Sequence, residues 1–147
     1  MGQKRKSEYP MSHVQYPMSK DGQGPLVKES GYDLEDRLID FAVRIIRLTE
    51  ALPNTKAGTH VAGQILRSGT APAPNYGEAQ SAESAADFVH KLKIALKELR
   101  ETLIWLKIIS RANLLKSAAL LAPLMRENDE LVAILFASVK TAGKRKL

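Results

Sequence analysis

The stretch SAADFVHKLKIALKELRETLIWLKIISR, residues 84–111, decides the fold of this chain. It contains neither Gly nor Pro and is the longest uninterrupted helical pattern in the sequence. Ser84, with Asp87 three residues later, forms a capping box that marks a helix N-terminus. The residues of its main face recur at steps of four and three, the spacing of one side of a helix: Phe88, Leu92, Ala95, Leu99, Thr102, Leu106 and Ile109. The spacing therefore predicts an amphipathic helix over 84–111.

The same stretch carries a second apolar face. At about 100° per residue, four large apolar side chains fall on the side opposite the main face: Ile94, Ile104, Trp105 and Ile108. A surface helix of a monomer should be polar there. Two apolar faces indicate two partners, so we predict that these four residues form an interface between copies of the chain.

A row of cations follows one flank of this helix: Lys93, Arg100, Lys107 and Arg111. From residue 91 to 116 there are seven basic and two acidic residues, whereas residues 33–50 hold three basic and five acidic ones. Cations seven residues apart lie about 10 Å apart on a helix and can follow a phosphate backbone. The alternatives are that the row pairs with an acidic helix of the same or a neighbouring subunit, or is solvated.

Composition limits the class of protein. The chain has 147 residues, enough for one domain, and 44% hydrophobic but only 5% aromatic residues. This mixture, rich in Ala, Leu, Lys and Glu, favours helix over sheet. There is no cysteine, which excludes disulfides and thiolate chemistry and fits a reducing compartment. Without an apolar run of about 18 residues or a signal peptide, we expect a cytoplasmic protein with no membrane partner.

The net charge of +6 belongs to the two ends of the chain. Residues 1–30 carry five basic and three acidic residues, and residues 140–147 carry four basic and no acidic ones. The remaining 31–139 hold 13 of each (22 − 5 − 4 and 16 − 3) and are neutral. We add the cations of the C-terminal end to the predicted nucleic-acid-binding set: Lys144, Arg145 and Lys146.

The remaining helices follow from apolar spacing and breakers. We predict helices over 34–52, with Asp33 as its N-cap, and over 56–82, broken across 68–75 by Pro72 and Pro74. The last helix should start between 117 and 123 and end at Gly143. The fold class predicted is all-α, an antiparallel up-down four-helix bundle with a kinked second helix. The domain organisation predicted is a disordered polar tail over 1–31, a bundle over 32–142 and a basic tail over 143–147.

Signatures of enzymes are absent from the sequence. There is no H-E-x-x-H, G-x-S-x-G, Walker or G-x-G-x-x-G motif, and His13, His60 and His90 lie far apart. We predict no catalytic residue, no metal site and no cofactor. Asn128 falls among apolar positions of the last helix, either as a buried polar residue that sets register or as a boundary residue. Without aromatic residues for stacking, nucleic-acid binding would be electrostatic, salt-sensitive and weakly specific.

Several short motifs together resemble a known family. They are Leu66-Arg67-Ser68-Gly69-Thr70, Asn75-Tyr76 with Glu78-Ala79, Asp87-Phe88, His90-Lys91-Leu92 and Ile94-Ala95-Leu96-Lys97-Glu98. They resemble the signature of the four helix bundle protein family, also called 23S rRNA-intervening-sequence proteins, and the resemblance spans residues 32–141. One departure is Ala71-Pro-Ala-Pro74, where many members have Ser-Ile-Gly-Ala, which bears on the regularity of the second helix.

The resemblance implies a non-enzymatic four-helix bundle that assembles as a homopentameric ring. Members are encoded within insertions in ribosomal RNA genes. A related fold serves as the accessory variability determinant of diversity-generating retroelements, where it is thought to bind nucleic acid and a reverse transcriptase. The sequence therefore predicts a homo-oligomer that binds RNA or DNA, or alternatively a scaffold that docks a protein such as a reverse transcriptase.

Overall fold

A computed structural model describes residues 29–145 of the chain and is all-helical over that range. The helices are α1 (Glu29–Ala51), α2 (Lys56–Thr70), α3 (Pro72–Gln80), α4 (Ala85–Arg111), the 3₁₀ turn η3 (Ala118–Leu120) and α5 (Leu121–Arg145). The chain divides into two compact units, residues 1–37 and 38–147, and the helical bundle belongs to the second apart from residues 29–37 of α1. The predicted disordered tail lies mostly outside the described residues, and the predicted domain boundaries stay predictions.

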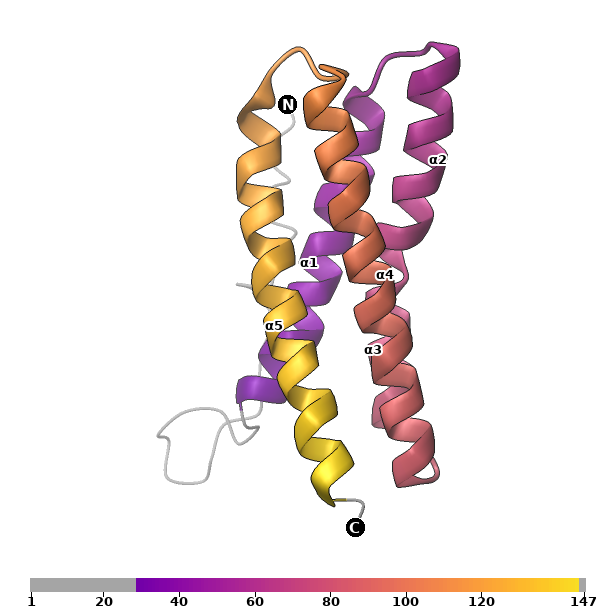
Figure 1. Cartoon of the computed structure of the whole chain (residues 1–147), viewed down its shortest axis with the longest axis vertical. Coiled ribbons are helices and arrows are strands. Elements are labelled where there is room, and N and C mark those ends of the chain that lie inside the picture. The colour runs from indigo at the N-terminus through magenta and orange to yellow at the C-terminus, as the bar shows by residue number, and fades with distance from the viewer. Residues whose placement is uncertain (1–28, 146–147) are drawn as a thin grey trace, which may run out of the picture. The chain divides into compact units, whose positions relative to one another are not determined.

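Within the second unit, consecutive helical rods run in opposite directions (Figure 1). The rods are α1, then α2 with α3, then α4, then α5, so α2 and α3 together make the kinked second helix. Short connections force neighbouring rods to be antiparallel. The predicted fold, an antiparallel four-helix bundle with a kinked second helix, is confirmed. Along residues 29–145, no helix has both the length and the apolar character needed to cross a membrane.

The prediction for α4 holds at both ends. The Ser84 hydroxyl accepts a hydrogen bond of 3.0 Å from the Asp87 amide, as the capping box requires. After Arg111 the chain turns at Asn113, whose φ of 53° is left-handed, a common way to end a helix. The buried face of α4 packs against α5, α3 and α2 and consists of Leu92, Ala95, Leu96, Leu99, Thr102, Leu106 and Ile109.

The break between α2 and α3 is shorter than predicted. Only Ala71 separates the two helices, and α3 resumes at Pro72 rather than at Tyr76. The prediction of a break across 68–75 was too wide because Pro72 lies in the first turn of α3. The backbone amides of a first turn have no partner within the helix, so a proline at this position removes no helical hydrogen bond. Asn75 supports the junction, since its side-chain amide donates a 3.0 Å hydrogen bond to the Ala71 carbonyl.

Two predicted helix ends are wrong. α1 begins at Glu29 rather than at Leu34, and Asp33 lies inside the helix, where the backbone is not in the extended conformation of an N-cap. α5 continues through Gly143 to Arg145. A glycine weakens a helix by about 1 kcal/mol without blocking it, so Gly143 does not end α5. The start of α5 after η3 falls inside the predicted interval.

The core of the second unit joins α1 closely to α2 at Gly69. A Cβ on this glycine would lie 2.8 Å from Cγ1 and Cγ2 of Ile45, so no side chain fits between the two helices. The inner seam of α5 consists of Leu121, Leu124, Asn128, Leu131 and Leu135. Asn128 is 0% exposed, so it is a buried residue and not a boundary one. Among the described residues, neither Nδ2 nor Oδ1 of its amide has a hydrogen-bond partner.

Candidate nucleic-acid interface

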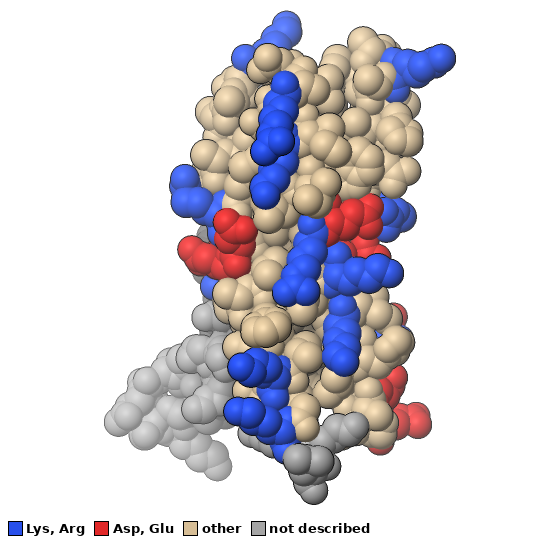
Figure 2. Space-filling view, in the orientation of Figure 1, with Lys and Arg blue, Asp and Glu red and all other residues tan. Residues whose placement is uncertain are grey.

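The outer face of α4 is lined with exposed cations, the four predicted ones and Lys97, which was not predicted: Lys93, Lys97, Arg100, Lys107 and Arg111. Within residues 34–144, none of these five forms an ion pair. From residue 93 to 111 they extend over about 27 Å of helix, at 1.5 Å per residue. Figure 2 shows Lys and Arg side chains following this face of the bundle from one end to the other. We call these five residues the α4 cation row.

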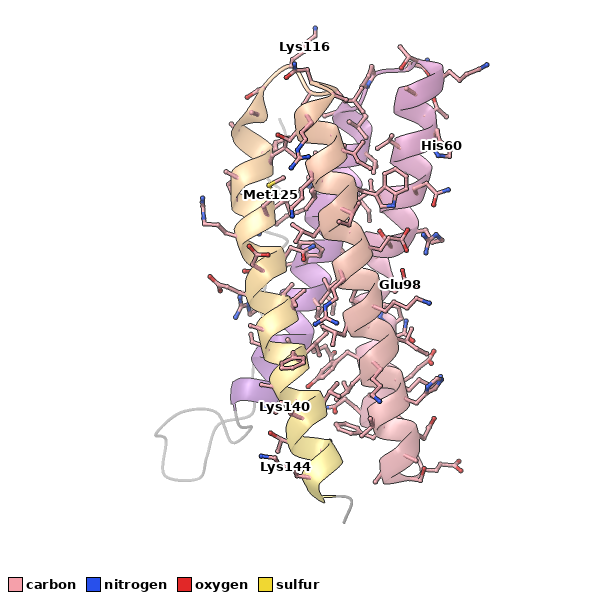
Figure 3. All side chains as sticks on the ribbon, in the orientation of Figure 1. His60, Glu98, Lys116, Met125, Lys140 and Lys144 are labelled. Atoms are coloured by element: carbon pink, nitrogen blue, oxygen red, sulfur yellow. The ribbon has the colours of Figure 1, made fainter. Side chains whose placement is uncertain are left out.

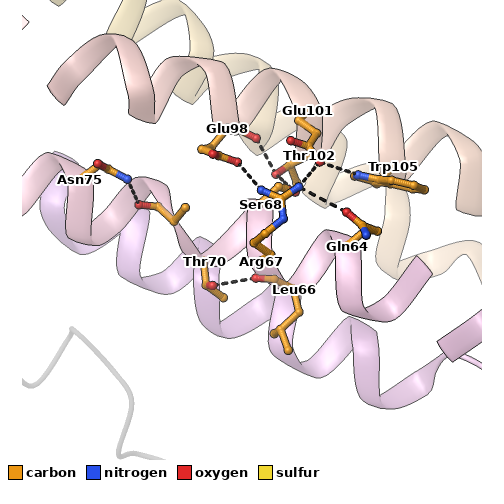
Figure 4. Close-up of polar contacts among 11 residues, drawn as sticks. Gln64, Leu66, Arg67, Ser68, Thr70, Asn75, Glu98, Glu101, Thr102 and Trp105 are labelled. Atoms are coloured by element: carbon orange, nitrogen blue, oxygen red, sulfur yellow. Dashed lines mark hydrogen bonds and ion pairs between the residues drawn. The ribbon is translucent and has the colours of Figure 1, made fainter. Parts of the chain in front are cut away.

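Two of the three acidic residues of α4, Glu98 and Glu101, are held on a different flank, towards α2. Nη1 of Arg67 lies 3.1 Å from Oε1 of Glu98, and Nη2 of Arg67 pairs with Oε2 of Glu101 (Figure 4). Glu98 lies about 140° around the helix from Lys93. Arg67 therefore balances both carboxylates on the flank towards α2, and the outer face is left positive.

The C-terminal part of α5 adds cations beside those of α4. Lys140 and Lys144 are exposed and lie near the end of α5 (Figure 3). Arg145 is in the last turn of the helix, but its side chain and all of Lys146 lie outside the described part of the structure. Of the seven residues predicted to bind nucleic acid, the structure thus places five, all of them exposed: Lys93, Arg100, Lys107, Arg111 and Lys144.

An exposed aromatic side chain, Phe136, lies among these cations and was not predicted as a site residue. It is 47% exposed. Cζ of Arg100 is 6.0 Å from the centroid of its ring, and Nζ of Lys140 is 5.9 Å from it. The sequence does indicate that Phe136 faces outward, because it follows Leu135 of the inner seam directly. The sequence does not indicate that Arg100, on another helix, lies close to its ring.

The four residues predicted to contact another copy differ in how far they are exposed. Ile104 is 53% and Ile108 39% exposed, and with Lys107, Arg111 and Ala112 they line a shallow depression. Ile104 lies only about 20° around the helix from Lys93, so this apolar pair sits within the α4 cation row.

Trp105 and Ile94, by contrast, are half-buried on the flank. The Trp105 ring meets that of His60 on α2 edge-on, with centroids 6.1 Å apart. Nε1 of Trp105 donates a 3.0 Å hydrogen bond to Oε2 of Glu101. Trp105 therefore already has contacts within its own chain, and whether any of the four residues meets another copy stays a prediction.

Ser68, Glu78 and Lys91, which belong to the motifs quoted in the sequence analysis, connect α4 to α2 and α3. The Thr102 and Ser68 hydroxyls form a buried 2.8 Å hydrogen bond between α4 and α2. Lys91 donates a 2.7 Å hydrogen bond to Glu78 on α3. That bond, followed by attraction to the Glu78 charge, raises the pKa of Lys91 above its usual value. Like Arg67, these residues fasten α4 to the kinked helix. Within residues 34–144, no three His, Asp or Glu side chains are grouped as metal ligands.

Comparison with known proteins agrees with this architecture. Residues 33–137 match the family model of the 23S rRNA-intervening sequence protein. A crystal structure of a protein of unknown function from the S23 ribosomal protein family of Bacteroides thetaiotaomicron VPI-5482 superposes with a TM-score of 0.68 at 36% identity. The similarity covers 73% of this chain and 98% of that one. Comparison with curated proteins gave no significant match. With the family model matching well over half of its length, this chain belongs to the 23S rRNA-intervening sequence protein family.

Proposed function

We propose that this protein is a non-enzymatic homo-oligomer that binds RNA or DNA through the α4 cation row, with the cations at the C-terminal end of α5. One observation carries the proposal: the five cations of the row are exposed and without an ion pair in the described structure. The two acidic residues of the same stretch are both paired with Arg67. The matching family is named after an intervening sequence of ribosomal RNA, and a structured RNA is for that reason one of the probes used below.

The length of the α4 cation row matches a polyanion whose charges are regularly spaced, such as a nucleic-acid strand. Its length of about 27 Å corresponds to roughly eight phosphates of one strand at 3.4 Å each. Binding of this kind releases counterions, so the affinity should fall steeply as salt rises. The row has no feature that reads base edges, so its contacts should position a nucleic acid without specifying its sequence.

We further propose that copies of the chain assemble into a ring, a pentamer as the family resemblance implies. The exposed pair Ile104 and Ile108 is available for this contact. Lys107 and Arg111 line the same depression and would repel an identical face. The contact in a ring should therefore join this face to a different face of the next copy, as head-to-tail assemblies do. In such a ring the part of the row outside this contact, Lys93, Lys97 and Arg100, would be repeated in every copy, which raises the overall affinity for one polyanion.

A second candidate function is a protein-interaction scaffold, for example for a reverse transcriptase. The apolar depression at Ile104 and Ile108 favours it, since a binding groove for a protein usually combines an apolar centre with a charged rim. Under this alternative the partner would contact the nucleic acid, and the isolated protein would not.

The test is nucleic-acid binding by a charge-reversed variant. Three cations of the row are replaced together, Lys93→Glu, Arg100→Glu and Lys107→Glu. The matched control reverses three exposed cations elsewhere: Lys56→Glu, Lys116→Glu and Arg126→Glu. Fluorescence anisotropy with a structured RNA and with duplex DNA is measured between about 50 and 200 mM salt. We expect the slope of log K against log salt for the duplex to fall by about 2 to 3 in the row variant and to change little in the control.

Light scattering at the same protein concentrations gives the oligomeric state. The neutral variant Ile104→Ser with Ile108→Ser should dissociate the oligomer without changing the charge. Equal binding by the row variant and the control, or parent binding that does not respond to salt, would refute the nucleic-acid proposal. A monomeric parent would refute the ring.

A further inference from the structure

Phe136 exposes much of a large aromatic ring on the outside of α5. It is nearly half exposed, at 47%, although Leu131 and Leu135 on the same helix are fully buried. Of the large apolar side chains exposed in the described part of the chain, six are aliphatic and only Phe136 is aromatic. It also has a cation from each of two helices close to its ring, Arg100 of α4 and Lys140 of α5.

We propose that Phe136 stacks on an unpaired nucleobase while Arg100 and Lys140 bind the phosphates on either side of it. The site would make this protein prefer single-stranded segments over duplex. The inference rests on the proposed function and deepens it, because it names the class of nucleic acid that the basic surface takes.

The arrangement of the helices continues the site in one direction. α4 and α5 are antiparallel (Figure 1). The path from Phe136 towards Lys144 therefore runs alongside the path from Arg100 back towards Lys93. Exposed cations follow both paths, Lys97 and Lys93 on α4, Lys140 and Lys144 on α5. A single strand lying along the seam between α4 and α5 would meet cations from both sides, with the aromatic ring at the head of the seam.

The energetics favour a base over the cations as the partner of the ring. An exposed cation–π contact strengthens an interaction only about 2- to 5-fold. Stacking of a base on an aromatic side chain is worth about 5- to 150-fold in affinity. A base can therefore displace a guanidinium or ammonium group from the ring. The displaced cation, on a long side chain, stays within reach of a phosphate.

Duplex nucleic acid cannot use the ring in this way, because its bases are already stacked on one another. It gains only the phosphate contacts of the cations. A second copy of this chain that offered the same face is also a poor partner for Phe136, since the same cations would face it. The geometry therefore distinguishes two kinds of affinity, an electrostatic one for any nucleic acid and a stacking one for unpaired bases.

The test uses the full chain and two probes, an oligothymidine of about 12 nucleotides and a duplex of the same length. Phe136→Ala should lower the affinity for the single strand by about 5- to 150-fold and leave its salt slope and the duplex affinity unchanged. Phe136→Trp should bind at least as well as the parent. Phe136→Leu, apolar but unable to stack, should behave like the alanine variant. Leu120→Ala is the matched control, because Leu120 is 48% exposed and lies outside the seam.

The outcomes separate this inference from the proposed function. Equal losses for the two probes, or no loss for either while the row variant still fails to bind, would overturn the stacking site and leave the proposed function standing. Light scattering shows whether Phe136→Ala changes the oligomeric state. If it does, and the affinity for the single strand is unchanged at matched oligomer concentration, the Phe136 side chain belongs to a contact between copies and the stacking site is overturned. Failure of the parent to bind either probe would overturn the proposed function itself.

Discussion

Replacement of the buried Asn128 by leucine should stabilise this protein. The side chain is 0% exposed, and its Nδ2 and Oδ1 atoms have no hydrogen-bond partner among the described residues. Leaving a buried polar group unpaired costs about 1–3 kcal/mol, so the two ends of the amide together cost about 2–6 kcal/mol. Leucine has the same branched skeleton and continues the leucines of the α5 seam.

The expected gain is smaller than that cost, because leucine is larger than asparagine. Overfilling a packed core costs about 1–3 kcal/mol. The difference between the midpoints of the two ranges is a net stabilisation of about 2 kcal/mol for Asn128→Leu. With an unfolding entropy of about 2.1 cal/mol/K per residue and roughly 110 residues in the bundle unit, each kcal/mol raises Tm by about 4 °C. The variant should melt about 9 °C above the parent.

Urea unfolding followed by circular dichroism measures this change. Parent and variant must be compared at one protein concentration, because assembly would make the apparent stability depend on it. Asn128→Ala is the control without added volume. A leucine variant that is less stable than the parent by more than about 1 kcal/mol, with an alanine variant that loses at least about 3 kcal/mol, would show that the amide is hydrogen-bonded in solution. That result would refute the assignment of Asn128 as an unpaired buried amide.

Two further predictions concern the contacts of the kinked helix. Gly69→Ala should destabilise the fold by about 1–3 kcal/mol, because the new Cβ would lie 2.8 Å from Ile45 side-chain atoms; Gly63→Ala, with no atom within 4 Å, should be neutral or stabilising in the same urea assay. The hydrogen bond to Glu78 raises the pKa of Lys91, so the pair is complete below the pKa of a free lysine and is lost only as pH rises through the raised one. Glu78→Gln should lower that pKa, and at pH of about 9 an amine-reactive reagent should modify Lys91 faster in the variant than in the parent. Equal rates would contradict the assignment.

The fold was predictable where local signals agreed with one another. α4 has a capping box at Ser84, no breaker, and a regular inner face, and it was predicted to within one residue. The start of α1 was not, since Asp33 resembles an N-cap but lies inside a longer helix. At the junction of α2 and α3, Pro72 was read as a breaker, yet a proline in a first turn also begins a helix. The local sequence is consistent with either geometry.

The candidate site was predictable in part. The exposure of the α4 cation row follows from the spacing on one helix. The position of Trp105 does not, because it depends on His60 and on the ion pairs of Arg67, both on α2. Phe136 was missed for the same reason, since Arg100 reaches its ring from a different helix. Spacing along one helix predicts which side chains face outward, and it cannot predict which helix supplies their neighbours.

The contacts on either side of Ala71 have a consequence for how the sequence can change over time. Arg67 fastens α2 to α4, and Glu78 fastens α3 to the same helix through Lys91. The angle at the junction is therefore held by α4 on both sides, in addition to the hydrogen bond between Asn75 and Ala71 at the junction itself. A substitution at Ala71 or Ala73 that leaves these contacts in place should therefore be accepted more readily than one at Arg67 or Glu78, each of which must be inherited together with its partners on α4.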